Sequence, residues 1–90
     1  MTEIGREWSA EVRRRLGKNL KHLRKLRDWT IYDVSSRSEI SWHTIHNWES
    51  GKNCPNVDML IWLCRKVGWR LGDVLHGCNI SPGGAEDAAK

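Results

Sequence analysis

Residues 30–49 decide the fold of this chain, and they read TIYDVSSRSEISWHTIHNWE. Thr30 and Ser41 are residue types that favour helix N-termini, because a side-chain hydroxyl there accepts a hydrogen bond from a free backbone N–H. A short helix that begins after Thr30 stops at a four-residue break over 38–41, and Ser41 opens a second helix. Two short helices joined by so tight a turn make a helix-turn-helix.

The second of these helices has an apolar face. Ile45 and Trp48 stand three residues apart, so both side chains are expected to face inward. The helix-turn-helix serves mainly to place its second helix in the major groove of DNA. The motif therefore predicts DNA binding.

The size and composition suit one small helical domain. The chain has 90 residues with six Trp, two Pro and no Phe, so indoles are expected to supply much of the core. The longest apolar run, over 59–64, is too short to span a membrane, and the charged first fifteen residues hold no signal-peptide core. Three widely spaced cysteines are expected to be free thiols, which predicts a cytoplasmic protein.

Positive charge is concentrated in one segment. Eight basic residues and no acidic one lie between Arg13 and Arg27, in a chain whose net charge is +4. A polyanion partner would require such a cluster, although a solvated helix face is often equally rich in Lys and Arg. Beside the helix-turn-helix, the cluster favours a nucleic-acid partner.

A long first helix is predicted from about residue 7 to Arg27, with Gly17 weakening its middle. Its apolar stripe recurs every three or four residues and comprises Trp8, Val12, Leu16, Leu20 and Leu23. A separate basic stripe on the same helix faces solvent or phosphate and comprises Arg14, Lys18, Lys21 and Lys25.

Two further helices are predicted after the helix-turn-helix. Asn56 is expected to cap a helix that ends at about Val67, and a short fifth helix carries Leu71, Val74 and Leu75. The predicted fold is all-α, with five helices in one domain over residues 1–76. Residues 1–15 extend the first helix, and residues 77–90 have almost no apolar content and are predicted to form a flexible tail.

Several short segments of the sequence occur in an order and at a spacing that are typical of one protein family. They are LRKLRDWT at 23–30, IS at 40–41, TIHNWESGK at 44–52, Pro55 and GWRLGDVL at 68–75. From about Leu20 to Leu75 the chain thereby resembles the lambda-repressor/Cro-like (XRE-type) helix-turn-helix family of transcription regulators. The resemblance implies a compact five-helix lambda-repressor-like DNA-binding domain, with the helix-turn-helix as its second and third helices.

The resemblance also implies a structural ion pair between Arg24 and Glu49, because relatives join an arginine late in the first helix to a glutamate that ends the third. A merely solvated Glu49 is the alternative. The chain departs from its relatives at Glu39, where they usually have Gly in a turn with positive φ. A side chain there costs about 1 kcal/mol in the left-handed conformation, so either the backbone differs or the strain is tolerated.

In relatives the exposed face of the third helix, here 41–50, reaches base edges. The predicted base-reading residues are Trp42, His43, Thr44 and Asn47. Asn47 could form a bidentate pair with adenine, and His43 could donate to guanine or to a phosphate. Trp42 stands where the family often has a polar residue. It either contacts thymine methyl groups, sugar or backbone, or folds back as core.

Phosphate contacts are expected at two places where backbone N–H groups point outward. One is the start of the second helix, where relatives have a glutamine in place of Ile31, so a backbone amide or Thr30 must substitute. The other is the loop over 50–53, in which Lys52 is the expected cation, with a merely solvated lysine as the alternative. The predicted phosphate-binding residues are Thr30, Ile31, Ser41, His46, Lys52 and Asn53.

Catalytic and metal-binding patterns are missing from the sequence. His43 and His46 have helical spacing, but the cysteines lack zinc spacing and no Cys-x-x-Cys occurs. Carboxylates are scattered and no Gly-rich phosphate loop is present. We therefore expect a protein that is not an enzyme and binds no metal, other cofactor or small-molecule ligand.

The resemblance implies a regulator of phage or bacterial repressor type that binds a roughly palindromic double-stranded DNA operator as a homodimer. The alternative is a protein-interaction module of antitoxin or anti-repressor type on the same fold. Its anchor cluster would comprise Trp8, Val12 and the exposed edges of Trp62 and Trp69, which otherwise complete the core.

Overall fold

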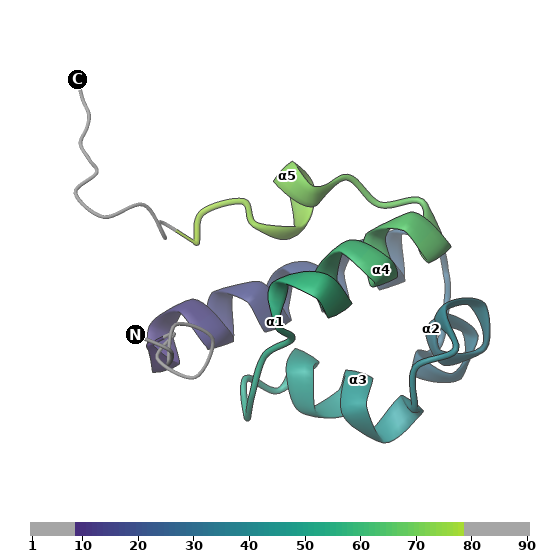
Figure 1. Ribbon diagram of the computed structural model, residues 1–90, viewed down its shortest axis with the longest axis horizontal. Helices are drawn as coiled ribbons and strands as arrows, with labels where there is room; N and C mark the ends of the chain where they lie inside the picture. Colours follow the sequence, from purple (N-terminus) through teal and green to yellow (C-terminus); the bar gives the residue numbers. More distant parts are fainter. Residues whose placement is uncertain (1–8, 79–90) are drawn as a thin grey trace.

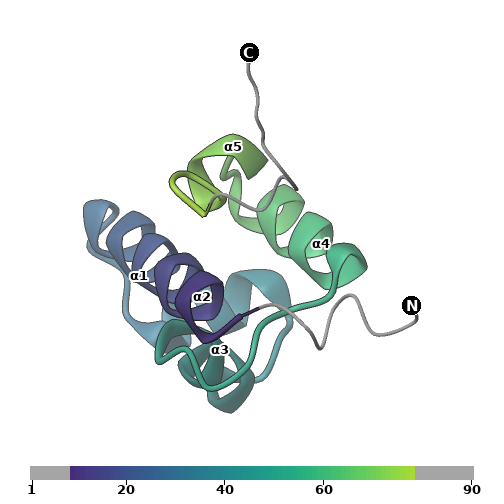
Figure 2. The same cartoon turned by 90° about the vertical axis from the view of Figure 1, so that its left-hand side faces the viewer.

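The computed structural model describes residues 9–78, and every regular element within that range is an α-helix (Figure 1). The helices are α1 (Ala10–Leu26), α2 (Ile31–Ser38), α3 (Trp42–Glu49), α4 (Val57–Val67) and α5 (Leu71–Val74). The predicted all-α class is confirmed, with α2 and α3 as the helix-turn-helix. In both Figure 1 and Figure 2, α3 and α5 lie on opposite sides of the domain with α1 and α4 between them, so α3 forms an outer edge.

The first helix begins later than predicted. Ser9 has an extended backbone (φ −63°, ψ 160°), and its hydroxyl accepts a hydrogen bond from the N–H of Val12 at 3.1 Å. Because an N-cap residue is itself not helical, α1 starts at Ala10 and not near residue 7. Trp8, the first residue of the predicted apolar stripe, lies outside the described residues.

The turn of the helix-turn-helix is shorter than predicted. Ser38 is the last residue of α2, so the break covers 39–41 and not 38–41. Ser38 is fully buried, and its hydroxyl donates to the carbonyl oxygen of Val34 at 2.7 Å and accepts from the N–H of Ile40 at 3.2 Å. The buried hydroxyl of Ser38 is therefore fully satisfied, by a carbonyl group within α2 and an N–H group of the turn.

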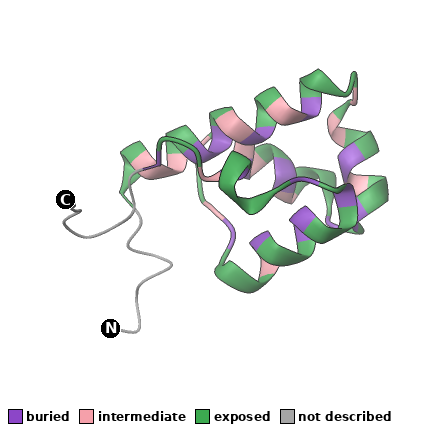
Figure 3. Ribbon diagram, turned by 90° about the horizontal axis from the view of Figure 1, so that it is seen from above, coloured by how far each residue is buried: buried purple, intermediate pink, exposed green. Residues whose placement is uncertain are grey.

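The core lies where the inner faces of the helices meet, and exposed positions cover the outside (Figure 3). Helix α1 packs against α3 and α5, and α2 packs against α3 and α4. The buried apolar residues are Leu16, Leu20, Val34, Ile40, Ile45, Trp48, Leu60, Leu63, Cys64, Val67, Trp69, Val74 and Cys78. Ile45 and Trp48 are buried as predicted, so α3 is attached to the domain through one face.

The packed part of the chain extends past α5. Cys78 is only 3% exposed and belongs to the core, although the sequence pattern assigned it to the flexible tail over 77–90. The side-chain amide of Asn19 donates to the carbonyl oxygens of Val74 and His76, both at 2.8 Å. These bonds hold the segment after α5 against α1, a long-range contact that local apolar content does not reveal. Residues 79–90 of the predicted tail lie outside the described residues.

The residues suggested as an aromatic anchor have different environments. Trp69 is buried and its ring lies 6.3 Å from that of Trp29, so of its two alternative roles it has the one in the core. Trp62 is 43% exposed, and its indole N–H donates to the carbonyl oxygen of Ser38 at 2.7 Å. Val12 is half-buried and packs against the core.

Gly17 allows α1 to approach α3 closely. A Cβ atom at this position would lie 2.5 Å from the carbonyl oxygens of both Trp48 and Glu49, a distance that such contacts do not tolerate. The sequence indicated only that a glycine weakens the middle of α1. Its tertiary role is to make room for the backbone at the end of α3.

We predict that Gly17→Ala lowers the free energy of unfolding by about 1–3 kcal/mol, because the added methyl group forces α1 and α3 apart. Urea denaturation measures the change. Gly72→Ala is the matched control, since a Cβ at Gly72 meets nothing within 4 Å, and this change is expected to be neutral or slightly stabilising. Equal stability of the two variants would contradict the close-approach argument.

Candidate nucleic-acid interface

Helix α3 is buried along one face and open along the other. The predicted base-reading residues all keep accessible surface: Trp42 and His43 are exposed, and Thr44 and Asn47 are half-buried. His43 and Asn47 lie one turn apart and share a face. His46 is exposed as well. The hydroxyl of Ser41 accepts from the N–H of His43 at 3.2 Å, which caps α3 as predicted.

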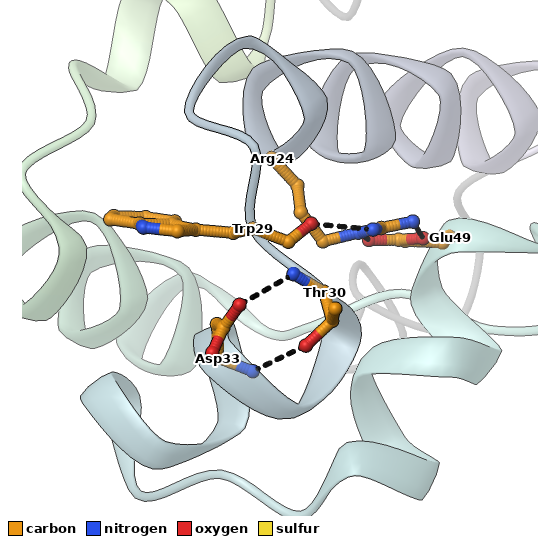
Figure 4. A network of polar contacts seen from close by, with 5 residues as sticks. All are labelled: Arg24, Trp29, Thr30, Asp33 and Glu49. Atoms are coloured by element: carbon orange, nitrogen blue, oxygen red, sulfur yellow. Dashed lines mark hydrogen bonds and ion pairs between the residues drawn. The ribbon is translucent and has the colours of Figure 1, made fainter.

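The end of α3 is fixed by a buried ion pair with α1 (Figure 4). The Nε of Arg24 lies 2.7 Å from Oε2 of Glu49, and its Nη2 lies 3.0 Å from Oε1. The remaining Nη1 donates to the carbonyl oxygen of Trp29 at 2.9 Å. The two side chains are only 10% and 7% exposed. The predicted structural pair is confirmed, and the alternative of a solvated Glu49 is wrong.

The start of α3 is fixed by the turn. Glu39 adopts the left-handed conformation (φ 65°, ψ 22°), and its N–H donates to the carbonyl oxygen of Ser35 at 2.8 Å. The hydroxyl of Ser35 donates to the carbonyl oxygen of Ile40 at 2.6 Å. The indole N–H of Trp62, on α4, donates to the carbonyl oxygen of Ser38, the residue before Glu39. The backbone therefore keeps the positive φ for which relatives use Gly, and these bonds hold it there.

An aromatic contact on the surface joins α2 to the first turn of α3. The ring of Trp42 lies 5.7 Å from that of Tyr32 and 5.5 Å from that of His43, edge-on to the latter. Trp42 is 45% exposed and is absent from the buried core, so the alternative in which it folds back as core is wrong. The sequence analysis did not single out Tyr32, because nothing local indicates that α2 carries it to Trp42.

At the start of α2, a capping box uses groups that were expected to meet phosphate (Figure 4). The hydroxyl of Thr30 accepts from the N–H of Asp33 at 3.1 Å, and the carboxylate of Asp33 accepts from the N–H of Thr30 at 2.8 Å. The T-x-x-D pattern could have revealed this reciprocal bond. The N–H groups of Ile31 and Tyr32 are among those that a helix leaves without an intrahelical partner. The side chain of Ile31 packs against the core.

The loop after α3 offers side chains but no free backbone N–H groups. The N–H groups of Lys52 and Asn53 both donate to the carbonyl oxygen of Asn47, at 3.0 and 3.5 Å, and those of Ser50 and Gly51 also bond to the end of α3. The expectation that loop N–H groups point outward is therefore wrong, because the terminal carbonyl groups of α3 accept them. The side chains of Lys52 and Asn53 are exposed.

The basic segment of α1 lies beside this loop. The Nε of Arg13 donates to the carbonyl oxygen of Gly51 at 3.2 Å, and a Cβ on Gly51 would lie 3.1 Å from Cγ of Arg14. The predicted basic stripe is exposed along its whole length, at Arg14, Lys18, Lys21 and Lys25. Arg24, one of the eight basic residues of the segment, is withdrawn from the surface by its pairing with Glu49.

Other kinds of site find little support in the described part of the chain. Residues 9–78 contain no group of three or more His, Cys, Asp or Glu side chains that could hold a metal ion. The same range contains no helix long and apolar enough to cross a membrane. All three cysteines are free, and burial raises the pKa of the thiols of Cys54, Cys64 and Cys78, which favours their protonated form.

Comparison with known proteins agrees with this geometry. The family model described as "Helix-turn-helix domain" matches residues 17–80, which is most of the chain. The chain belongs to this helix-turn-helix family, of the Cro/C1 type, whose members bind DNA and regulate transcription. No curated protein and no solved structure matches the chain.

We predict that Glu49→Ala lowers the free energy of unfolding by about 3–5 kcal/mol, because it leaves the guanidinium of Arg24 buried without its counter-charge. Thermal and urea melts measure the loss. Glu11→Ala, an exposed carboxylate on α1, is the control and should cost less than about 1 kcal/mol. A changed base preference with unchanged melting would contradict a purely structural role.

We also predict that Glu39→Gly raises the free energy of unfolding by up to about 1 kcal/mol, because glycine adopts φ near 65° without the Cβ penalty. Chemical denaturation measures the gain. Glu39→Ala removes the same carboxylate but keeps the Cβ, so it should not stabilise. If both variants were equally stabilised, charge and not backbone strain would be the cause.

Proposed function

We propose that this protein is a sequence-specific transcription regulator of repressor type, which places α3 in the major groove of its operator. The observation that carries the proposal is the attachment of α3. Its inner face is buried and its last residue is paired with α1, so the outward face is held in a fixed orientation. A rigid exposed helix of this kind fits the groove, which admits an α-helix.

Base recognition is assigned to the exposed face of α3. Asn47 can pair with N6 and N7 of adenine, a contact worth about 1–3 kcal/mol of discrimination. His43 lies one turn away on the same face and can donate to guanine or to a phosphate. Trp42 and Thr44 complete the base-reading set.

Phosphate contacts position the helix without selecting a sequence. We assign them to the backbone N–H of Ile31 and to the hydroxyl of Thr30, together with Ser41, which caps α3, and the exposed side chain of His46. The exposed side chains of Lys52 and Asn53 act from the loop. The stripe on α1 adds Arg14, which lies against that loop.

A homodimer on a palindromic operator would set two copies of α3 about 34 Å apart on one face of the DNA. The outer surface of α4 supports the pairing of chains, because Val57 and Ile61 are exposed there at 60% and 41% beside Trp62. The same observation favours the second candidate function, a protein-interaction module without DNA readout. In either role the chain acts by binding and not by catalysis.

Selection from a randomised duplex library tests the proposal. Wild type is expected to enrich a motif with two-fold symmetry, and Asn47→Ala should relax it at one position per half-site. Asn53→Ala is the matched control, because loss of an amide that contacts phosphate weakens all sequences alike. Affinity for the motif should fall by about 0.9 log units per log unit of salt for each neutralised phosphate. Absence of any enriched motif would favour the protein-interaction function instead.

A further inference from the structure

Tyr32 and Trp42 form an aromatic surface that the core does not use. The two rings come from α2 and α3, are tilted by 52° and lie 5.7 Å apart, within the range of favourable aromatic pairs. Tyr32 is 63% exposed, more than Trp42, and neither residue belongs to the buried core or packs among its half-buried partners. Two large rings in mutual contact on the surface form an apolar patch that water hydrates poorly.

The position of this patch limits what it can meet. Trp42 is the first residue of α3 and His43 is the next, with the imidazole edge-on to the indole at an interplanar angle of 88°. The indole is therefore held between a ring from α2 and a ring from its own helix. Its accessible part lies in the first turn of the helix that is proposed to enter the major groove.

The chemistry of the groove suggests the ligand. Bases present hydrogen-bonding groups along the floor of the major groove, and the apolar group presented there is the C5-methyl of thymine. 5-Methylcytosine carries a methyl group at the same ring position. An apolar ring in a fixed orientation suits such a methyl group better than it suits a donor or an acceptor.

We propose that Trp42 contacts the C5-methyl group of one pyrimidine in each half-site, and that Tyr32 is a positioning residue that holds the indole for this contact. The proposal rests on the proposed function and adds to it a methyl-dependent step of recognition. The competing role for Tyr32 is to cover the junction of α2 and α3, which would affect stability without affecting methyl recognition.

The test uses the operator obtained by library selection. Each thymine of a half-site is replaced in turn by deoxyuridine, which removes the methyl group and nothing else, and each cytosine in turn by 5-methylcytosine. Affinities are measured at moderate salt for wild type, Tyr32→Ala and Tyr32→Phe. The phenylalanine variant is the matched control, because it keeps the ring and loses only the hydroxyl. Thermal melting verifies that each variant is folded.

Burial of one methyl group is worth about fourfold in affinity. Wild type and Tyr32→Phe should therefore bind about fourfold more weakly when one particular thymine per half-site lacks its methyl group. If that position holds cytosine, methylation should strengthen binding by about the same factor. In Tyr32→Ala the difference should shrink to less than about twofold while operator binding persists.

Three outcomes would overturn the inference, and they are distinguishable. Wild type that is indifferent to every methyl change contradicts the contact itself, while the enriched motif still supports the proposed function. Methyl discrimination that survives undiminished in folded Tyr32→Ala contradicts the positioning role. Failure of selection to enrich any motif removes both the inference and the function on which it rests. The wild-type scan needs no variant, so the first outcome does not depend on how Tyr32→Ala folds.

Discussion

The ion pair between Arg24 and Glu49 is the interaction on which the orientation of the helix-turn-helix depends. Both side chains are almost completely withdrawn from water, so each charge is tolerated only because the other lies within hydrogen-bonding distance. The guanidinium also donates to the carbonyl oxygen of Trp29, the residue before the N-cap of α2, and so fixes the segment that leads into the motif. The contact is possible because Gly17 has no side chain to separate α1 from α3.

The other end of α3 is held by hydrogen bonds around a strained residue. Glu39 keeps a left-handed backbone, and Ser35 and Trp62 bond the carbonyl groups on either side of it. With both ends fixed and one face buried, the backbone of α3 has little freedom to lose on binding. Preorganisation of this kind is what a base-reading surface requires.

The electrostatics around α3 are arranged through the loop that follows it. Carbonyl groups at a helix C-terminus carry negative partial charge, which would repel phosphate. Here the N–H groups of the loop bond to them, and Lys52 and Arg14 present positive charge nearby. At the start of α2 the local charge is less favourable to phosphate, because the carboxylate of Asp33 lies there and accepts the hydrogen bond of the Thr30 N–H. The cationic side chains that can attract phosphate thus lie mainly beyond the C-terminal end of α3, while the start of α2 offers uncharged donors.

The sequence by itself determined the all-α class, the caps at Thr30, Ser41 and Asn56, and the buried side of α3, because capping and helical periodicity are local properties. The pair of Arg24 and Glu49 followed from the family pattern. Only the tertiary structure decided the features that depend on residues distant in the chain. Cys78 is packed because the side chain of Asn19 binds the segment before it. The N–H groups of the loop after α3 donate to carbonyl groups at the end of that helix. Tyr32 contacts Trp42 because the turn folds α2 against α3. The periodicity of residues along one helix does not indicate which side chains of another helix will contact them.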